Sequence, residues 1–145
     1  MSNPSICHLA ISRMVAALSN ATGALDRVFD SREAAYSRDE MPCIAITAPD
    51  SEESKAFGDG VDEHSALVTV DVLVRGDPWR AVADPIAVDV HRILMRDAQL
   101  LAMLVDMRKQ GRKWEGQEAD QTAGCDSITY RLVYLSRSND MSASI

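Results

Sequence analysis

The spacing of apolar residues predicts a helix near the start of the chain. Five apolar side chains recur at helical intervals and share one face, namely Cys7, Ile11, Met14, Val15 and Leu18. Ser5 precedes them and has a hydroxyl that can cap a helix N-terminus. Gly23 follows the last of them, so we expect the helix to end there.

Two short strands are predicted after this helix. Residues 25–30 alternate between two faces, and residues 31–40 form a polar connection. Residues 43–48 are apolar except for Thr47, which is typical of a strand near the middle of a sheet. Pro49 ends that strand.

Residues 50–62 are polar and acidic and include Gly58 and Gly60, so we expect a long loop here. A loop of this length inside a compact domain is usually a functional arm or disordered. The segment is therefore our first candidate for contact with another protein.

The clearest strand covers residues 65–75. Its even-numbered positions are small or aliphatic and point to one side: Ala66, Val68, Val70, Val72 and Val74. Gly76 and the Asp77-Pro78 pair break the strand. We expect the helices to pack on this aliphatic face.

Capping signals predict two helical segments next. Asp84-Pro85 resembles a cap followed by proline at the first helical position, and a core stripe follows it: Ile86, Val90, Ile93 and Leu94. Asp97 can cap a further short turn that carries Leu100, Leu101 and Leu104.

The C-terminal part of the chain alternates between polar segments and one strong strand. Residues 107–117 are expected to form an exposed edge strand, and residues 118–126 a second polar loop. Residues 128–135 alternate as the last strand, with Tyr130 and Tyr134 on one side. Residues 137–145 are expected to be a loose tail.

These elements predict one domain over residues 1–145, because no linker or internal repeat divides the chain. The order is a helix, three strands, a helix and one or two further strands. The expected fold is α+β, with an antiparallel or mixed sheet of four to five strands and two main helices packed on one face.

Composition excludes several classes of function. A formal net charge of -7 argues against general nucleic-acid binding, which needs clustered Lys and Arg. The three cysteines are far apart and fit reduced thiols. The first residues lack the pattern of a signal peptide, and the apolar runs are too short to span a bilayer. We therefore expect a cytoplasmic protein without membrane contact.

Catalytic spacing is missing from the sequence. His8, His64 and His91 belong to no motif that joins a nucleophile to a base, so they are interpreted as surface or packing residues. A hydrolase or isomerase that uses Asp84 and His91 near Trp79 is the enzymatic alternative. For this alternative the sequence offers neither a third catalytic group nor an oxyanion site.

No cofactor or metal is expected either. Cys7 and His8 are adjacent and therefore diverge on a helix, whereas the other Cys and His residues stand alone. The glycines lack the lysine and the strand-to-helix position of a phosphate-binding loop. The expectation is a protein that acts by assembly with other proteins.

Candidate interaction residues fall in three places. The acidic segment contributes Glu52, Glu53, Lys55, Phe57 and Asp59. The polar edge segment contributes Lys109, Arg112 and Trp114. Trp79 completes the set, and both tryptophans are left open between an interface anchor and a core residue.

Taken in order, the segments resemble the tail terminator (minor tail protein U-like, tail completion) family of long-tailed bacteriophages and prophages. The resemblance is carried by core residues and turns across almost the whole chain: the first helix, residues 27–32, 41–46, 66–76, 84–94 and 130–134. Relatives tend to carry a glycine near residues 100–104, where this chain has none. The local turn is therefore expected to differ.

The resemblance implies a subunit of a hexameric ring that caps the tail tube, stops its growth and provides the joint to the capsid. Its partners would be further copies of itself, the tail-tube protein and a head-completion or neck protein. It would occupy the bacterial host cytoplasm during assembly and then the virion tail. The alternative is a type III secretion-like chaperone that binds an unfolded partner segment.

Overall fold

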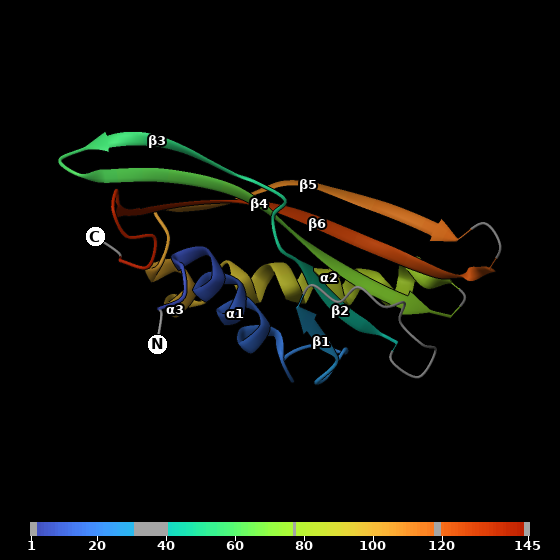
Figure 1. Ribbon diagram of the computed structural model, residues 1–145. Helices are drawn as coiled ribbons and strands as arrows, with labels where there is room; N and C mark the ends of the chain where they lie inside the picture. Colours follow the sequence, from blue (N-terminus) through green and yellow to red (C-terminus); the bar gives the residue numbers. More distant parts are fainter. Residues whose placement is uncertain (1–2, 31–40, 77, 118–119, 144–145) are drawn as a thin grey trace.

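The computed structural model describes residues 3–30, 41–76, 78–117 and 120–143. The fold is α+β, as predicted (Figure 1). Its elements are α1 (Ile6–Leu18), β1 (Val28–Asp30), β2 (Cys43–Thr47), β3 (Glu52–Gly58), β4 (Val61–Arg75), α2 (Trp79–Leu94), α3 (Ala98–Ala102), β5 (Asp106–Gln117) and β6 (Asp120–Arg137).

The strands form one mixed sheet in the order β1-β2-β4-β6-β5, and β3 pairs with β4 beside this path. It has six strands, not the four to five expected. β1 and β2 are parallel, and every other pair is antiparallel. The β3–β4 and β5–β6 hairpins extend toward opposite ends of the molecule (Figure 1).

β4 and β6 are the centre of the sheet and supply much of the core. Their alternate residues are buried on one face, as the sequence pattern predicted: Val68, Val70, Val72, Val74, Ile128, Tyr130, Leu132 and Tyr134. Burying this aliphatic surface is the main force that holds the helices on the sheet.

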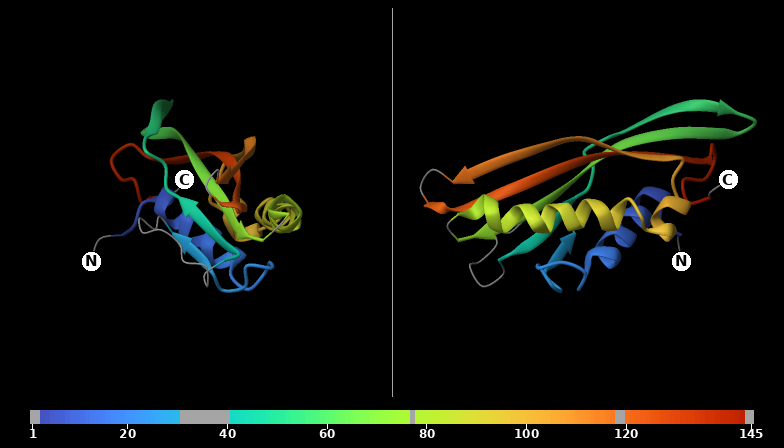
Figure 2. Two further views of the ribbon diagram at one scale, coloured as in Figure 1. Left: turned by 90° about the vertical axis from the view of Figure 1, so that its right-hand side faces the viewer. Right: turned by 180° about the vertical axis from the view of Figure 1, so that it is seen from behind.

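Three helices accompany the sheet, where two main ones were expected. α2 lies along β4 and β6, as Figure 2 shows from behind, and α1 contacts α2 and β1. α3 follows α2 and contacts α1. The first and third helices begin as predicted, because Ser5 accepts a hydrogen bond from the His8 amide and Asp97 from the Leu100 amide.

Several predicted boundaries are wrong. α1 ends at Leu18, and the left-handed residue after it is Asn20, with φ of 59°, rather than Gly23. The strand expected over residues 25–30 is shorter, because Leu25 also has a positive φ and β1 begins at Val28. The polar connection over residues 31–40 lies outside the described residues.

The acidic loop expected over residues 50–62 is a β-hairpin. Residues 52–58 are β3, which pairs with the start of β4 through a turn at Asp59 and Gly60. The second polar loop is also mostly strand, since β6 already begins at Asp120. An alternating apolar pattern arises when one face of a strand is buried. These segments have no such pattern, and they were therefore predicted as loops.

α2 begins at Trp79 rather than at Pro85, so Asp84 is not its cap and Pro85 lies inside the helix. Pro78 stands at the N-cap position. Trp79 and Ala83 pack against the core, which supports the first turns despite the interior proline.

The segment after β6 is tied to the body along its described part, although a loose tail was expected. The Ile6 amide donates to the Met141 carbonyl at 3.1 Å, and the Ser138 amide donates to the Gly60 carbonyl at 2.8 Å. Within the parts of the chain that the structure describes, no helix has the length and apolar character needed to cross a membrane.

Candidate interaction surfaces

The β3–β4 hairpin arm is the most exposed part of the sheet. We use this name for residues 50–66. All seven residues of β3 are exposed, and Phe57 near its tip is 61% exposed. Asp59 and Gly60 form the turn with φ of 54° and 76°, and Lys55 pairs across the strands with Glu63 at 3.4 Å. The arm is thus ordered by pairing with β4 and presents polar and aromatic side chains to solvent.

A polar cluster fixes the base of the arm to the body. Tyr134 donates its hydroxyl to Glu52, whose other oxygen lies 3.3 Å from Nδ1 of His64. The two His64 nitrogens also lie 2.7 Å from the hydroxyls of Ser54 and Ser136. Burial, together with the bond to Glu52, raises the pKa of Tyr134 well above its usual range. Glu52 therefore helps to position the arm. Glu53, the next residue in β3, points to the opposite face of the sheet and takes no part in this cluster.

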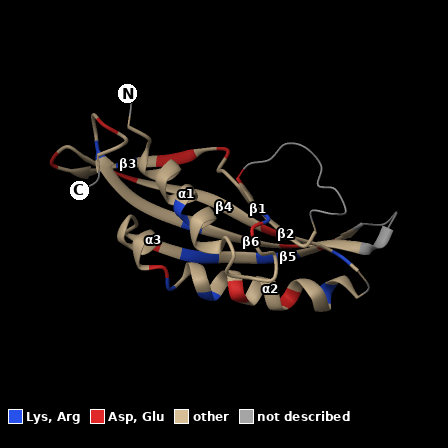
Figure 3. Ribbon diagram, turned by 90° about the horizontal axis from the view of Figure 1, so that it is seen from below, with Lys and Arg blue, Asp and Glu red and all other residues tan. Residues whose placement is uncertain are grey.

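β5 is the opposite edge of the sheet and carries a run of basic residues. Figure 3 marks them along the strand. Two β-bulges interrupt its pairing with β6, between Lys109 and Gly111 and between Gly116 and Gln117. Lys109 is exposed and faces α2. Burial of His91, followed by the charge of Lys109, lowers the pKa of His91. Bulges and charges on an edge strand limit pairing with unselected partners.

Arg112 is committed to an ion pair within the chain. It donates through Nε and Nη2 to the two oxygens of Asp126 at 2.9 and 2.6 Å, and Nη2 also lies 2.8 Å from Asp84 on α2. The side chain of Asp126 is fully buried. The two carboxylates raise the pKa of Arg112, so its charge is permanent. Arg112 holds α2 on the sheet and is a structural residue first.

The two tryptophans differ in role. Trp114 is 44% exposed, and the guanidinium carbons of Arg80 and Arg112 lie 5.1 and 4.9 Å from its ring centroid. Trp79 instead packs on the backbone of β6: a Cβ built on Gly124 would lie 2.1 Å from its ring. Trp79 is therefore a packing residue, and Trp114 is the tryptophan available for a contact.

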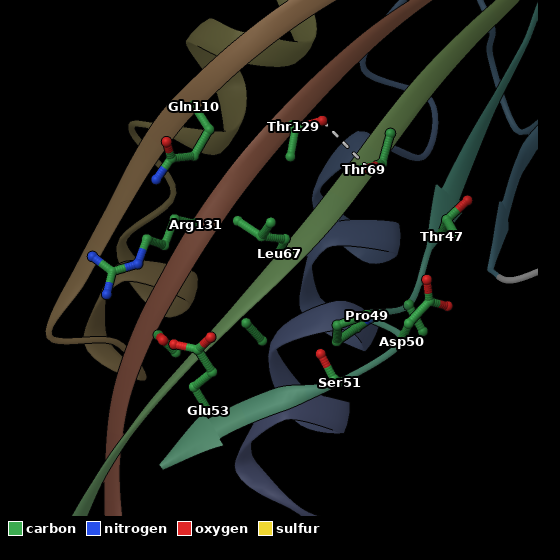
Figure 4. A pocket seen from close by; sticks show the side chains of 13 residues that line it. Thr47, Pro49, Asp50, Ser51, Glu53, Leu67, Thr69, Gln110, Thr129 and Arg131 are labelled. Carbon is green, nitrogen blue, oxygen red and sulfur yellow. Dashed lines mark hydrogen bonds between the residues drawn. The ribbon is translucent and has the colours of Figure 1, made fainter. Parts of the chain in front are cut away.

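A shallow groove of about 670 Å³ crosses the open face of the sheet. We use open face for the side that carries Leu67, Thr69, Thr129 and Arg131, with α1 behind the strands (Figure 4). Leu67 is 52% exposed on its floor, and the hydroxyls of Thr69 and Thr129 lie 3.4 Å apart. Glu53 and Gln110 line its borders.

The side chains considered for catalysis lie outside this groove. Burial raises the pKa of Cys125 to about 11, so its thiol stays protonated near neutral pH. Asp84 and His91, the enzymatic alternative, have separate partners: Asp84 accepts from Arg112, and His91 lies 2.9 Å from the Tyr130 hydroxyl. No group of three or more potential metal ligands occurs among the described residues.

Sequence reasoning named nine interaction residues, and the structure separates them. Glu53, Lys55, Phe57 and Asp59 share the hairpin arm, and Lys109 and Trp114 share the β5 edge. Glu52, Trp79 and Arg112 have intramolecular roles. The polar contacts of Tyr134 and Asp126 were not predicted. Tyr134 lies in an alternating strand and was expected to be a core residue, and Asp126 lies in a segment that was expected to be a loop.

No protein-family model matches the chain, and no curated protein matches it.

Proposed function

We propose that this chain is a structural assembly protein of a phage or prophage tail, which forms a ring on the tail tube, stops tube growth and provides the joint to the capsid. The observation that carries the proposal is the hairpin arm, whose strand β3 exposes all seven of its residues. The family resemblance of the sequence supplies the ring and its place on the tail.

A lone subunit has little use for such an arm. Exposed sheet edges invite pairing with other chains, and proteins that act alone usually shorten or cover them. Here two long edges, β3 and β5, lie open on opposite sides of the same sheet. An aromatic side chain near the tip of an exposed arm is also typical of a residue that becomes buried in a complex.

The charge of the chain fits a ring through which DNA passes. A formal net charge of -7 repels phosphate and so reduces adhesion of DNA to the channel wall. The proposed partners are further copies of the chain, the tail-tube protein and a head-completion or neck protein.

The test is electron microscopy of the protein mixed with growing tubes of the tail-tube protein. We expect rings at tube ends and shorter tubes. Phe57→Asp should abolish capping, whereas Leu25→Asp, at another apolar residue that is 53% exposed, should leave it intact. A stable dimer that binds an unfolded segment and ignores tube ends would instead support the chaperone alternative and overturn the proposal.

A further inference from the structure

We infer that copies of this chain join head to tail by pairing the β3 edge of one copy with the β5 edge of the next, so that the sheet continues across subunits. This inference rests on the proposed function, because it names the surfaces by which the ring forms.

Both edges are open to a partner strand. The sheet path ends at β5, and β3 borders the other side of β4. β3 is exposed along its whole length, and β5 is exposed at Arg108, Lys109 and residues 113–116. Main-chain donors and acceptors at such edges are available for strand addition.

Charge selects which edges pair. Residues 50–63 of the hairpin arm hold six carboxylates and one lysine. Residues 106–117 of β5 hold four basic residues and two carboxylates, and one of the four, Arg112, is already paired with Asp84 and Asp126. Two acidic arms would repel each other, whereas β5 keeps a small positive charge, because its three other basic residues face two carboxylates on the same strand. Pairing β3 with β5 avoids the repulsion between acidic arms and brings opposite charges together. A contact between two different surfaces is heterologous, which produces rings or filaments and not a closed dimer.

The bulges fix the length of the match. Regular pairing runs from Glu52 to Ala56 in β3 and from Gly111 to Gly116 in β5. Glu53 borders the groove of the open face. Lys113 lies opposite Ser127, two residues from Thr129, and so projects to the same face. We therefore place Glu53 directly opposite Lys113, whose ammonium lies 2.5 Å from Glu115 on the same strand and would be shared between the two carboxylates in the contact.

Strand direction and offset agree with closure into a ring. In the series β3-β4-β6-β5 each strand is antiparallel to the next, so β3 and β5 of one copy run in opposite directions. Rotation about an axis along the strands keeps these directions, so β3 of one copy is also antiparallel to β5 of the next. Ser54 is level with Tyr134 and Arg112 with Ile128. Six residues of β6 separate these levels, a rise of about 20 Å.

Four strands at about 4.8 Å each give a width of about 19 Å per copy. A rise of about 20 Å over that width corresponds to a strand tilt of about 45°, at the upper end of the range found in closed β-barrels, which is roughly 35–45°. The opposed hairpins are thus placed as a tilted, closed sheet requires.

Charge reversal tests the contact through the oligomeric state, measured by light scattering on a sizing column and by electron microscopy on tail tubes. Glu53→Lys and Lys113→Glu should each raise the concentration needed for assembly about tenfold or more, because each places like charges opposite one another. The double variant and an equimolar mixture of the two single variants should both assemble like the unmodified chain, since opposite charges then meet at every contact.

Two control variants change the same charges elsewhere. Asp26→Lys and Arg96→Glu alter exposed residues off both edges and should assemble normally. Equal urea midpoints for all variants would show that folding is intact.

Each outcome decides between the two proposals. Single variants that assemble normally would overturn the β3–β5 contact and leave ring formation standing. Single variants that fail while neither the double variant nor the mixture recovers would overturn the register. An unmodified chain that stays monomeric alone and on tail tubes would overturn the proposed function together with the contact.

Discussion

The ion pair between Arg112 and Asp126 gives the sharpest prediction about stability. Arg112→Met removes both donors from a carboxylate that is fully buried and leaves its charge without a partner. Breaking a buried pair in this way costs about 3–5 kcal/mol. Since domains of this size are typically stable by about 5–15 kcal/mol, the loss is a large share of the total.

Urea unfolding followed by circular dichroism measures this loss as a lower midpoint at an unchanged slope. Arg92→Met is the matched control, because Arg92 and Asp89 form an exposed pair on α2 that contributes less than about 1 kcal/mol. Combining Arg112→Met with Asp126→Leu should recover most of the stability, since no buried charge remains. A loss below about 1 kcal/mol in Arg112→Met alone would refute the reasoning.

Three further predictions concern packing and charge. Gly124→Ala should lower the free energy of unfolding by about 1–3 kcal/mol and shift the fluorescence of Trp79, because the new methyl group meets the indole ring. Gly111→Ala is the control: its Cβ would have nothing within 4 Å and should change the free energy of unfolding by less than about 0.5 kcal/mol. Asp97→Ala removes both the α3 cap and the acceptor of Arg13 and should destabilise the chain by about 1 kcal/mol or more. Asp97→Asn keeps a capping side chain and should cost less in urea unfolding at neutral pH. The bond from Arg13 lowers the pKa of Asp97 in the folded chain. The stability from this bond is therefore present above about pH 4, the pKa of an unfolded aspartate, and is lost as the pH falls through the lower folded pKa. Acid unfolding of Asp97→Asn should lack this loss, and an acid profile equal to that of the unmodified chain would contradict the prediction.

The sequence predicted those elements whose burial pattern is regular. The valines of β4 alternate because one face is buried, and the caps at Ser5 and Asp97 are local, so both are readable without tertiary information. β3 was missed for the opposite reason. None of its seven residues is buried, so neither face leaves a periodic apolar signal, and its charged residues and Gly58 are typical of a loop.

Side-chain pairs between neighbouring strands could not be predicted for a different reason. Arg112 and Asp126 lie 14 positions apart and become neighbours only through the register of β5 on β6. The bulges set that register, and nothing in the sequence marks where an extra residue enters a strand. The choice between anchor and core for Trp79 likewise depended on Gly124, which makes room for the ring on a strand far along the chain.

The opposite charges of the two edges connect folding with assembly. A strand as exposed as β3 gains little from burial in one copy, so its pairing with β4 and the cluster around Glu52 and His64 hold it in place. That arrangement keeps the arm extended before a partner arrives, which lowers the ordering cost of association. Charges on the edges then discourage pairing of like edges and favour β3 with β5. An exposed, ordered and charged edge is thus the feature that a head-to-tail ring needs and that a solitary subunit would have covered.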